Sequence, residues 1–279
     1  MMLKNGIYGI LILVAAACMG DDTQTYTATP AELDIPPFFE SSILPPEIPR
    51  DNPLTVEGIA LGKALFYDPI LSANNTQSCA SCHLQSGSFS DPNQFSVGID
   101  GSIGTRNSMP LFNLAWNRRG PFFWDGRAAT LEDQIFEPIT NPIEMANTWP
   151  NAVAALQNSG TYPDLFDAAF GSTTIDSVKV SKAIAQFVRT LISGNSKFDR
   201  YLNGVEDLSP AEERGMNIFL DETRGDCFHC HGNPMNPLWT DNRFHNNGLD
   251  EFFTDRGLGA VTGRSEEHTS ELQSPDHLV

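Results

Sequence analysis

Apolar residues recur every three to four positions along two stretches of the chain, as they do on one face of an α-helix. The clearer stretch covers 176–192, and its apolar stripe consists of Val180, Ile184, Phe187, Val188, Leu191 and Ile192. The other stretch covers 55–66. A further helix is expected to begin at Ser209, because Pro follows directly and Glu212 comes three residues later, which is typical of a helix N-terminus. Strand-like alternation is rare, so the pattern predicts an all-α fold.

Two regions between these helices lack such a period. The residues between 92 and 120 are rich in Gly, Asn, Ser and Pro, which predicts a long loop of the kind that often lines functional sites. The residues over 203–208 precede the helix at Ser209, and we expect a domain boundary there.

Composition narrows the class of protein. The chain has 279 residues, of which 40% are hydrophobic, with 18 Phe and 4 Trp. This content is sufficient for a packed core and excludes a long disordered chain. The formal net charge of −18 argues against a nucleic-acid partner and suits a basic protein partner.

The N-terminal residues resemble an export signal. Residues 1–17 contain one Lys and then an apolar run that is too short to span a bilayer, as in a secretory signal peptide. The run ends in A-A-A-C, which resembles a bacterial lipoprotein cleavage site and predicts a lipid anchor at Cys18. In the alternative interpretation the signal is cut nearby and Cys18 is incidental. Both predict a periplasmic protein, in which 18–53 is a tether and lead-in rich in Asp, Thr and Pro.

The C-terminal residues have a different origin. The sequence R-S-E-E-H-T-S-E-L-Q-S over 264–274, with L-V at 278–279, resembles a translated sequencing adapter. We therefore interpret 264–279 as a non-native tail and expect the natural protein to continue beyond Gly263.

Four of the 5 cysteines form one pattern twice, in the order C-x-x-C-H: Cys79, Cys82 and His83, then Cys227, Cys230 and His231. On a helix, residues at i, i+3 and i+4 share one face. Two thiols can then bond to one haem while the His binds its iron, so each motif predicts a covalently bound c-type haem.

Other interpretations of these cysteines are a zinc site, a redox disulfide and two structural disulfides. A His directly after each second Cys is not needed by any of them and favours two haems. Because the motifs lie far apart, we expect two cytochrome c-like domains packed face to face: a first unit over 54–204 and an incomplete second unit over 205–263.

Further segments resemble the bacterial dihaem cytochrome c peroxidase family, which includes the haem enzymes that mature methylamine dehydrogenase. The resemblance covers 50–263, and its segments are Phe89-Ser90-Asp91, Arg106-Asn107, Phe122-Phe123-Trp124-Asp125-Gly126-Arg127-Ala128, Leu131-Glu132-Asp133-Gln134 and Asn141-Pro142-Ile143-Glu144-Met145.

The resemblance implies roles for individual residues. The first haem would react with peroxide, with His83 as the proximal ligand and with Gln134 and Glu144 in the distal pocket. Trp124 would lie on the electron route between the haems. The second haem would store an electron and have a second axial ligand, usually Met and sometimes Tyr. A calcium ion would lie between the haems, with Asn107 as one of its ligands.

The chemistry of the two pocket residues agrees with these roles. Cleavage of a peroxide O–O bond needs a base that moves a proton from one oxygen to the other, and a carboxylate such as that of Glu144 can do this. The amide of Gln134 can position the substrate. The alternatives are that Glu144 is an ordinary surface acid and that Trp124 is a core residue.

The chain departs from many dihaem peroxidases in two respects. No His lies between His83 and His229, so no His is available to cap the first haem iron, and we expect this haem to be open or water-ligated when oxidised. The second axial ligand of the second haem is absent from 232–263 unless Met235 or His245 supplies it, and we expect it in the natural sequence beyond Gly263. Met235 is too close to His231 to reach the opposite face, and we place His245 near the haem edge, where it would bond to a propionate.

Three functions follow. The first is reduction of hydrogen peroxide to water with electrons from a small c-type cytochrome or cupredoxin. The second is peroxide-driven oxidation of another protein or an organic substrate. The third is electron transfer alone. A homodimer is compatible with each.

Overall fold

A computed structural model of the chain describes residues 26–117, 120–232, 234–245 and 254–263. Within these residues the chain is helical, with isolated β-bridges and no strand, so the all-α prediction is confirmed. None of the helices described combines the length and the apolar character that crossing a bilayer requires. The expected signal peptide, the anchor at Cys18 and the tail over 264–279 lie outside the described residues.

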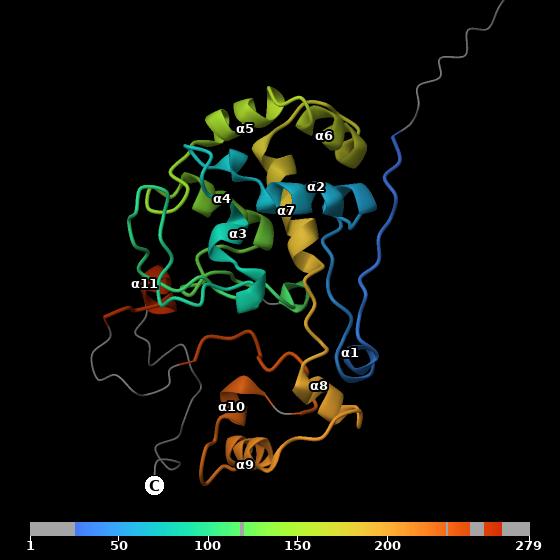
Figure 1. The fold of residues 1–279 in the computed structure, drawn as a ribbon, viewed down its shortest axis with the longest axis vertical. Helices are drawn as coiled ribbons and strands as arrows, with labels where there is room; N and C mark the ends of the chain where they lie inside the picture. The colour runs from blue at the N-terminus through green and yellow to red at the C-terminus, as the bar shows by residue number, and fades with distance from the viewer. Residues whose placement is uncertain (1–25, 118–119, 233, 246–253, 264–279) are drawn as a thin grey trace, which may run out of the picture.

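The helices form a larger and a smaller part (Figure 1). Helices α2 to α7 gather in the larger part, α8, α9 and α10 lie in the smaller part, and α11 lies beside loops of the larger part. In chain order the α-helices are α1 (Pro37–Ser42), α2 (Val56–Tyr67), α3 (Cys79–Cys82), α4 (Leu131–Thr140), α5 (Trp149–Gln157), α6 (Tyr162–Phe170), α7 (Ser177–Arg189), α8 (Lys197–Leu202), α9 (Pro210–Phe219), α10 (Phe228–His231) and α11 (Leu258–Thr262). Short 3₁₀ helices are η1 (Pro69–Leu71), η2 (Gln85–Gly87) and η3 (Leu114–Trp116).

Helices α2 and α7 are those that the apolar period predicts. The side chains of Thr55 and Asp176 cap them by accepting hydrogen bonds from the first turn. Helix α7 ends earlier than predicted because the backbone N–H of Thr190 turns back to the carbonyl of Phe187. The two helices approach closely at Gly62, where a Cβ would lie 1.9 Å from a backbone oxygen of α7.

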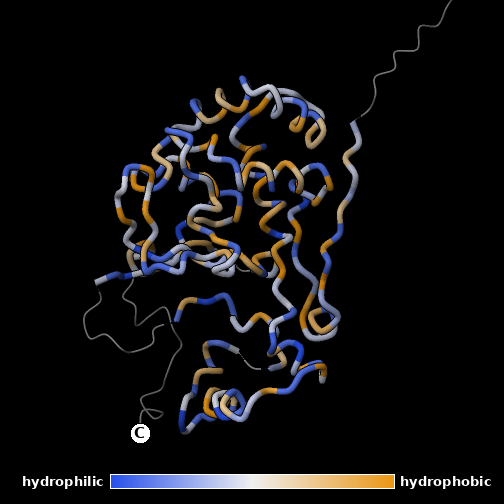
Figure 2. Tube along the Cα trace, in the orientation of Figure 1, coloured by the Kyte–Doolittle hydropathy of each residue, from blue (hydrophilic) through white to orange (hydrophobic). Residues whose placement is uncertain are grey.

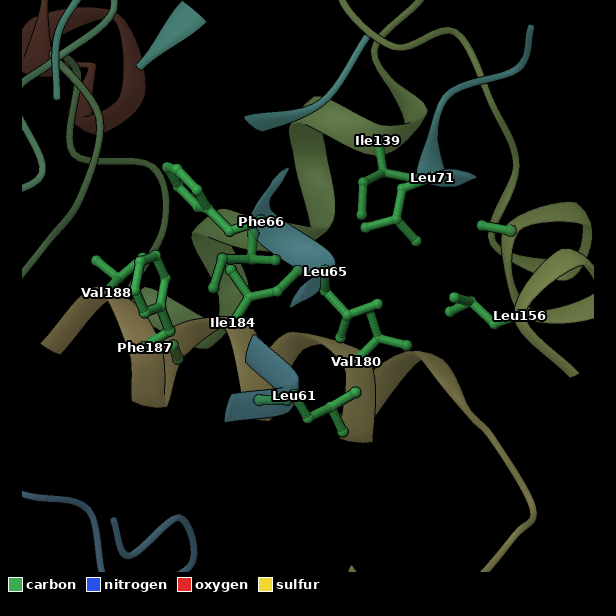
Figure 3. Packing of buried hydrophobic residues seen from close by; sticks show 14 of the residues in the cluster. Leu61, Leu65, Phe66, Leu71, Ile139, Leu156, Val180, Ile184, Phe187 and Val188 are labelled. Carbon is green, nitrogen blue, oxygen red and sulfur yellow. The ribbon is translucent and has the colours of Figure 1, made fainter. Parts of the chain in front are cut away.

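The core of the larger part lies between α2, α4 and α7 (Figure 3). Leu65, Phe66, Val180 and Ile184 are each at most 2% exposed. Burying one such side chain stabilises the fold by about 1.5–3 kcal/mol. This core therefore supports the first C-x-x-C-H motif, whose Cys79 packs against it.

A buried ion pair fixes α4 on α7. The guanidinium of Arg189 donates to both carboxylate oxygens of Glu132, at 2.6 and 2.9 Å, and Asn52 adds a third hydrogen bond at 2.6 Å. Burial alone would raise the pKa of Glu132, but these donors lower it below its usual value. The pair sets the orientation of the helix that carries Gln134.

Part of the expected lead-in packs on the protein. It forms the short helix α1, in which Phe39 is fully buried and meets the ring of Trp116 at a centroid distance of 5.4 Å. The sequence shows no period there, because one helical turn with a single buried ring is too short to produce one.

The smaller part is packed differently from the core of the larger part. Helix α9 begins as predicted, with a capping box between Ser209 and Glu212. However, neither α9 nor α10 has a buried residue, and Ile218 is 39% exposed. Figure 2 shows apolar stretches of α2 and α7 inside the larger part and an apolar stretch of α9 in the smaller part.

Candidate haem sites

The first C-x-x-C-H motif forms the short helix α3. A capping box between Ser78 and Ser81 starts the helix, and the backbone N–H of His83 closes it on the carbonyl of Cys79 at 3.0 Å. The four motif cysteines are free thiols. Each pair is therefore available for covalent attachment.

A backbone carbonyl orients the ring of His83. Nδ1 lies 3.0 Å from the carbonyl oxygen of Phe89, across a turn that includes η2. An Nδ1–H that donates to this carbonyl leaves Nε2 free to bind a metal, as second-shell partners of metal-binding histidines do. Burial lowers the pKa of His83, which favours the neutral ring that binds iron.

Glu144 is half-buried in a turn that follows α4. Its Oε1 accepts a hydrogen bond from Nδ2 of Asn141 at 2.7 Å. Burial raises the pKa of Glu144, against this hydrogen bond and the charge of Arg127, which lower it. An ordinary surface acid has no such environment, so Glu144 is suited to hold and release a proton.

A loop over 97–103 joins Glu144 to the attachment helix. The N–H of Ile99 donates to the carbonyl oxygen of Glu144 at 3.0 Å. The backbone of Gly98 packs closely against the same turn, since a Cβ at this position would lie 1.5 Å from the carbonyl oxygen of Ile143. Gln77 completes the link, because its Nε2 is 3.2 Å from Sγ of Cys82 and 3.0 Å from the carbonyl oxygen of Val97.

Gln77 was not identified from the sequence. It lies two residues before the first motif, and nothing in its spacing distinguishes it from other polar residues. It is 7% exposed, and its Oε1 has no hydrogen-bond partner among the described residues. A buried amide oxygen without a hydrogen-bond partner is costly, so Gln77 is held in place by the two contacts of its Nε2.

Gln134 is partly buried on α4, and its side chain makes no hydrogen bond with Glu144 or with any other described residue. The structure therefore does not join the two predicted pocket residues directly. Gln134, Pro138 and Asn141 are spaced as neighbours on one helical face, and Asn141 holds Glu144. This places Gln134 on the side of α4 that leads to the carboxyl.

Trp124 is not a core residue, since it is 48% exposed. Its Nε1 donates to the carbonyl oxygen of Asn107 at 2.8 Å. The amide nitrogen of Asn107 bonds to the carbonyls of Asp91 and Asn93, and its Oδ1 accepts a 3.4 Å bond from Ser90. One amide oxygen does not make a calcium site, and the described residues include no cluster of three His, Cys, Asp or Glu side chains that could hold a metal ion. The calcium ion remains a prediction.

The second motif lies on α10 and is more open. His231 is exposed, and its ring lies 6.3 Å from that of Phe219. His229 points to Asp226 instead. Met235 is 71% exposed, and Nε2 of His245 lies 3.0 Å from both carboxylate oxygens of Asp241. The placement of His245 at a haem edge stays a prediction.

The first site fits a covalent haem. Cys79 and Cys82 form no disulfide, and the carbonyl oxygen of Phe89 orients the ring of His83 through Nδ1. The second site offers the same donor types, Cys227, Cys230 and His231, without a comparable enclosure.

Comparison with known proteins identifies the family. The family model of the di-haem cytochrome c peroxidases matches residues 56–207. The methylamine utilization protein MauG of Methylorubrum extorquens is 38% identical over 255 residues, which are 89% of this chain and 68% of that protein. The cytochrome c peroxidase Ccp of Escherichia coli is 38% identical over 187 residues, covering 66% of this chain and 39% of that protein.

Solved structures that resemble this chain come from the same kind of protein. A MauG-like protein associated with microbial copper homeostasis superposes with a TM-score of 0.72 at 33% identity, covering 84% of this chain and 71% of that one. The diheme peroxidase BthA of Burkholderia thailandensis gives 0.65 at 26% identity, covering 76% and 62%. The chain spans 62% of the length of the MauG of Methylophilus methylotrophus, to which it is 37% identical. These similarities confirm the resemblance seen in the sequence and imply two c-type haems. The chain belongs to the di-haem cytochrome c peroxidase family, a family of oxidoreductases.

Proposed function

We propose that the chain carries the peroxide-reacting centre of a dihaem c-type peroxidase that reduces hydrogen peroxide to water. One hydrogen peroxide takes up two electrons and two protons and yields two waters. The observation that supports this most strongly is the half-buried Glu144, whose backbone carbonyl is bonded to the loop over 97–103, which Gln77 links in turn to the helix that would hold the first haem.

Glu144 acts as the base and then as the acid. Its carboxylate would take the proton from one peroxide oxygen and return it to the other oxygen, which departs as water. When bound, the haem supplies an iron that holds peroxide and passes electrons to it. Burial raises the pKa of Glu144, so that the carboxyl keeps the proton between the two transfers. Gln134 orients the peroxide with its amide.

Electrons arrive through the second unit. His231 would hold the second haem, and Trp124 lies on a loop of the first unit that contacts residues following the second motif. The donor would be a small c-type cytochrome or a cupredoxin, and the formal net charge of −18 favours one with a basic surface. The protein would act in the periplasm, with a lipid anchor at Cys18, as a monomer or a homodimer, and with calcium held partly by Asn107.

A second function is peroxide-driven oxidation of another protein. It is favoured by the 48% exposure of Trp124, since an exposed indole can receive electrons from a substrate outside the chain. Electron transfer alone is the weakest proposal, because it gives no role to the half-buried Glu144.

A steady-state turnover assay distinguishes peroxide reduction with a small redox donor from peroxide-driven oxidation of another protein. The purified dihaem protein is mixed with peroxide and a reduced small cytochrome c or cupredoxin, and oxidation of the donor is followed by absorbance. The first proposal predicts two donor molecules oxidised for each peroxide. Peroxide consumption without donor oxidation would contradict it and favour oxidation of another substrate.

A further inference from the structure

Two neighbouring hydrogen bonds join the segment Arg106-Asn107 to the segment Trp124-Asp125, where we place the electron route. The indole of Trp124 donates to the carbonyl oxygen of Asn107 at 2.8 Å, and the next residue, Asp125, accepts from Nη1 of Arg106 at 2.6 Å. The side chain of Arg106 therefore holds the loop at Asp125, the residue that follows Trp124.

Arg106 also holds the segment over 254–263. Its Nε and Nη2 donate to the two carboxylate oxygens of Asp255, each at 2.6 Å. This is the bidentate geometry that arginine forms with a carboxylate and that lysine cannot form. Asp255 lies before α11, which Figure 1 shows beside loops of the larger part.

Apolar contacts continue the same interface. A Cβ at Gly126 would lie 3.1 Å from Cδ1 of Leu258 and 3.1 Å from the ring of Phe244. Gly126 has a φ of +70°, so its backbone favours glycine as well. The loop that carries Trp124 is thus in contact with Phe244 and with Leu258.

The clamp is partly enclosed. Asp125 is 8% exposed and also bonds to Nη1 of Arg127 at 2.9 Å. Burial alone would raise the pKa of Asp125, but the two guanidinium groups lower it below its usual value, so the carboxylate stays charged near neutral pH. Arg106 therefore lies between two carboxylates, one from each side of the interface.

We infer that Arg106 is a positioning residue for electron transfer between the two haem sites: it clamps the loop of Trp124 to the segment over 254–263 and so fixes the indole between the two units. This inference rests on the proposed function, in which electrons pass by Trp124. Electron transfer slows as the distance between its partners grows, so a displaced indole lowers the rate.

The test compares Arg106→Gln, Asp255→Asn and the double variant in the purified dihaem protein. Electron transfer from the second to the first site is followed by absorbance after flash reduction, without peroxide. Reaction of the first site with peroxide is measured separately by stopped flow. Arg200→Gln is the matched control. Arg200 forms an ion pair with Glu206, with an N–O distance of 2.6 Å, and this pair is not part of the interface.

Arg106→Gln is expected to slow electron transfer between the sites several-fold, because the loop of Trp124 is no longer clamped to the segment over 254–263. Asp255→Asn should slow it less, since Asp125 still holds Arg106, and the double variant should be no slower than Arg106→Gln alone. Haem content, the peroxide reaction and Arg200→Gln should match the original protein. Unchanged electron transfer in Arg106→Gln, additive effects of the two substitutions or loss of haem in both single variants would overturn the inference.

The proposed function fails in a different way. If the original protein does not react with peroxide, the peroxidase proposal is wrong, whereas the flash-reduction measurement still reports on the clamp because it uses no peroxide.

Discussion

The two C-x-x-C-H motifs have the same residue pattern but lie in different surroundings. The first packs against a core whose side chains are almost fully buried, and a carbonyl orients its His83. The second lies near α9, which buries no residue, and its His231 is exposed. The motif alone therefore predicts haem attachment, whereas the environment predicts which site does chemistry. Glu144, a half-buried acid, is linked to the first motif through its backbone carbonyl and the loop over 97–103.

Substitution of the attachment cysteines tests the different roles of the two motifs and should have the largest effect on the reaction with peroxide. Cys79→Ala with Cys82→Ala should abolish the reaction with peroxide, because the reacting centre is lost. Cys227→Ala with Cys230→Ala should abolish turnover with a donor but keep the first reaction with peroxide. Pyridine haemochrome assays give the haem content and stopped-flow absorbance gives the reaction. Equal loss of the peroxide reaction in both variants would contradict the division of roles.

Glu144→Gln tests the carboxyl while keeping its shape. The rate of the first reaction with peroxide should fall by roughly 10²–10⁴-fold, since an amide cannot move the proton. Stopped-flow absorbance measures it at unchanged haem content. Asp133→Asn, an exposed carboxylate on α4, is the matched control and should retain the rate.

The pH profile gives this substitution a second readout. The base must be ionised, and burial raises the pKa of Glu144, so the rate should fall with decreasing pH at a higher pH than for an exposed Glu, whose pKa is about 4.3. Glu144→Gln should lack this acid limb. A limb that persists in the variant would assign the proton to another group.

Substitutions of aromatic residues compare the packing of the two parts. Phe66 is 1% exposed and contacts the rings of Phe89 and Phe187. Phe66→Ala should lower the free energy of unfolding by about 3–5 kcal/mol. Phe219→Ala, on α9, should lower it by less than about 1 kcal/mol. Urea unfolding followed by circular dichroism measures both, and similar losses would show that the smaller part is as well packed as the larger one.

Gly98→Ala tests the loop that joins Glu144 to the first motif. The new Cβ would meet the carbonyl of Ile143, so the loop must move and the bond from Ile99 to Glu144 is strained. We expect the peroxide reaction to slow by about 10- to 100-fold, and the free energy of unfolding to fall by about 1–3 kcal/mol because the backbone must shift. Gly104→Ala is the control, because its Cβ would lie 3.5 Å from the nearest atom, an ordinary contact. Equal rates in the two variants would remove the loop from the mechanism.

The parts of this fold that could be predicted from sequence are those that local chemistry determines. Thr55, Asp176 and Ser209 cap helices within one turn, and each motif spans one helical turn. The parts that could not be predicted depend on residues distant in sequence. Arg106 meets Asp255, 149 positions later, and Phe39 is buried against Trp116.

The same distinction holds within the candidate site. The family pattern indicated Glu144, but its link to the first motif depends on Gln77, which reaches the carbonyl of Val97 through a loop without periodicity. No pattern of residue types encodes such a contact. The exposed position of Trp124 is likewise a result of tertiary structure, since most Trp residues with apolar neighbours are buried.

The central claim is that the iron of the first haem has no second His ligand and so can bind peroxide, and the electron paramagnetic resonance spectrum of the oxidised dihaem protein tests it most directly. No His lies between His83 and His229 to cap the first iron. The account predicts a high-spin ferric signal that disappears in the variant with Cys79→Ala and Cys82→Ala. Two low-spin signals without a high-spin one, with the first site ligated by two His, would contradict it.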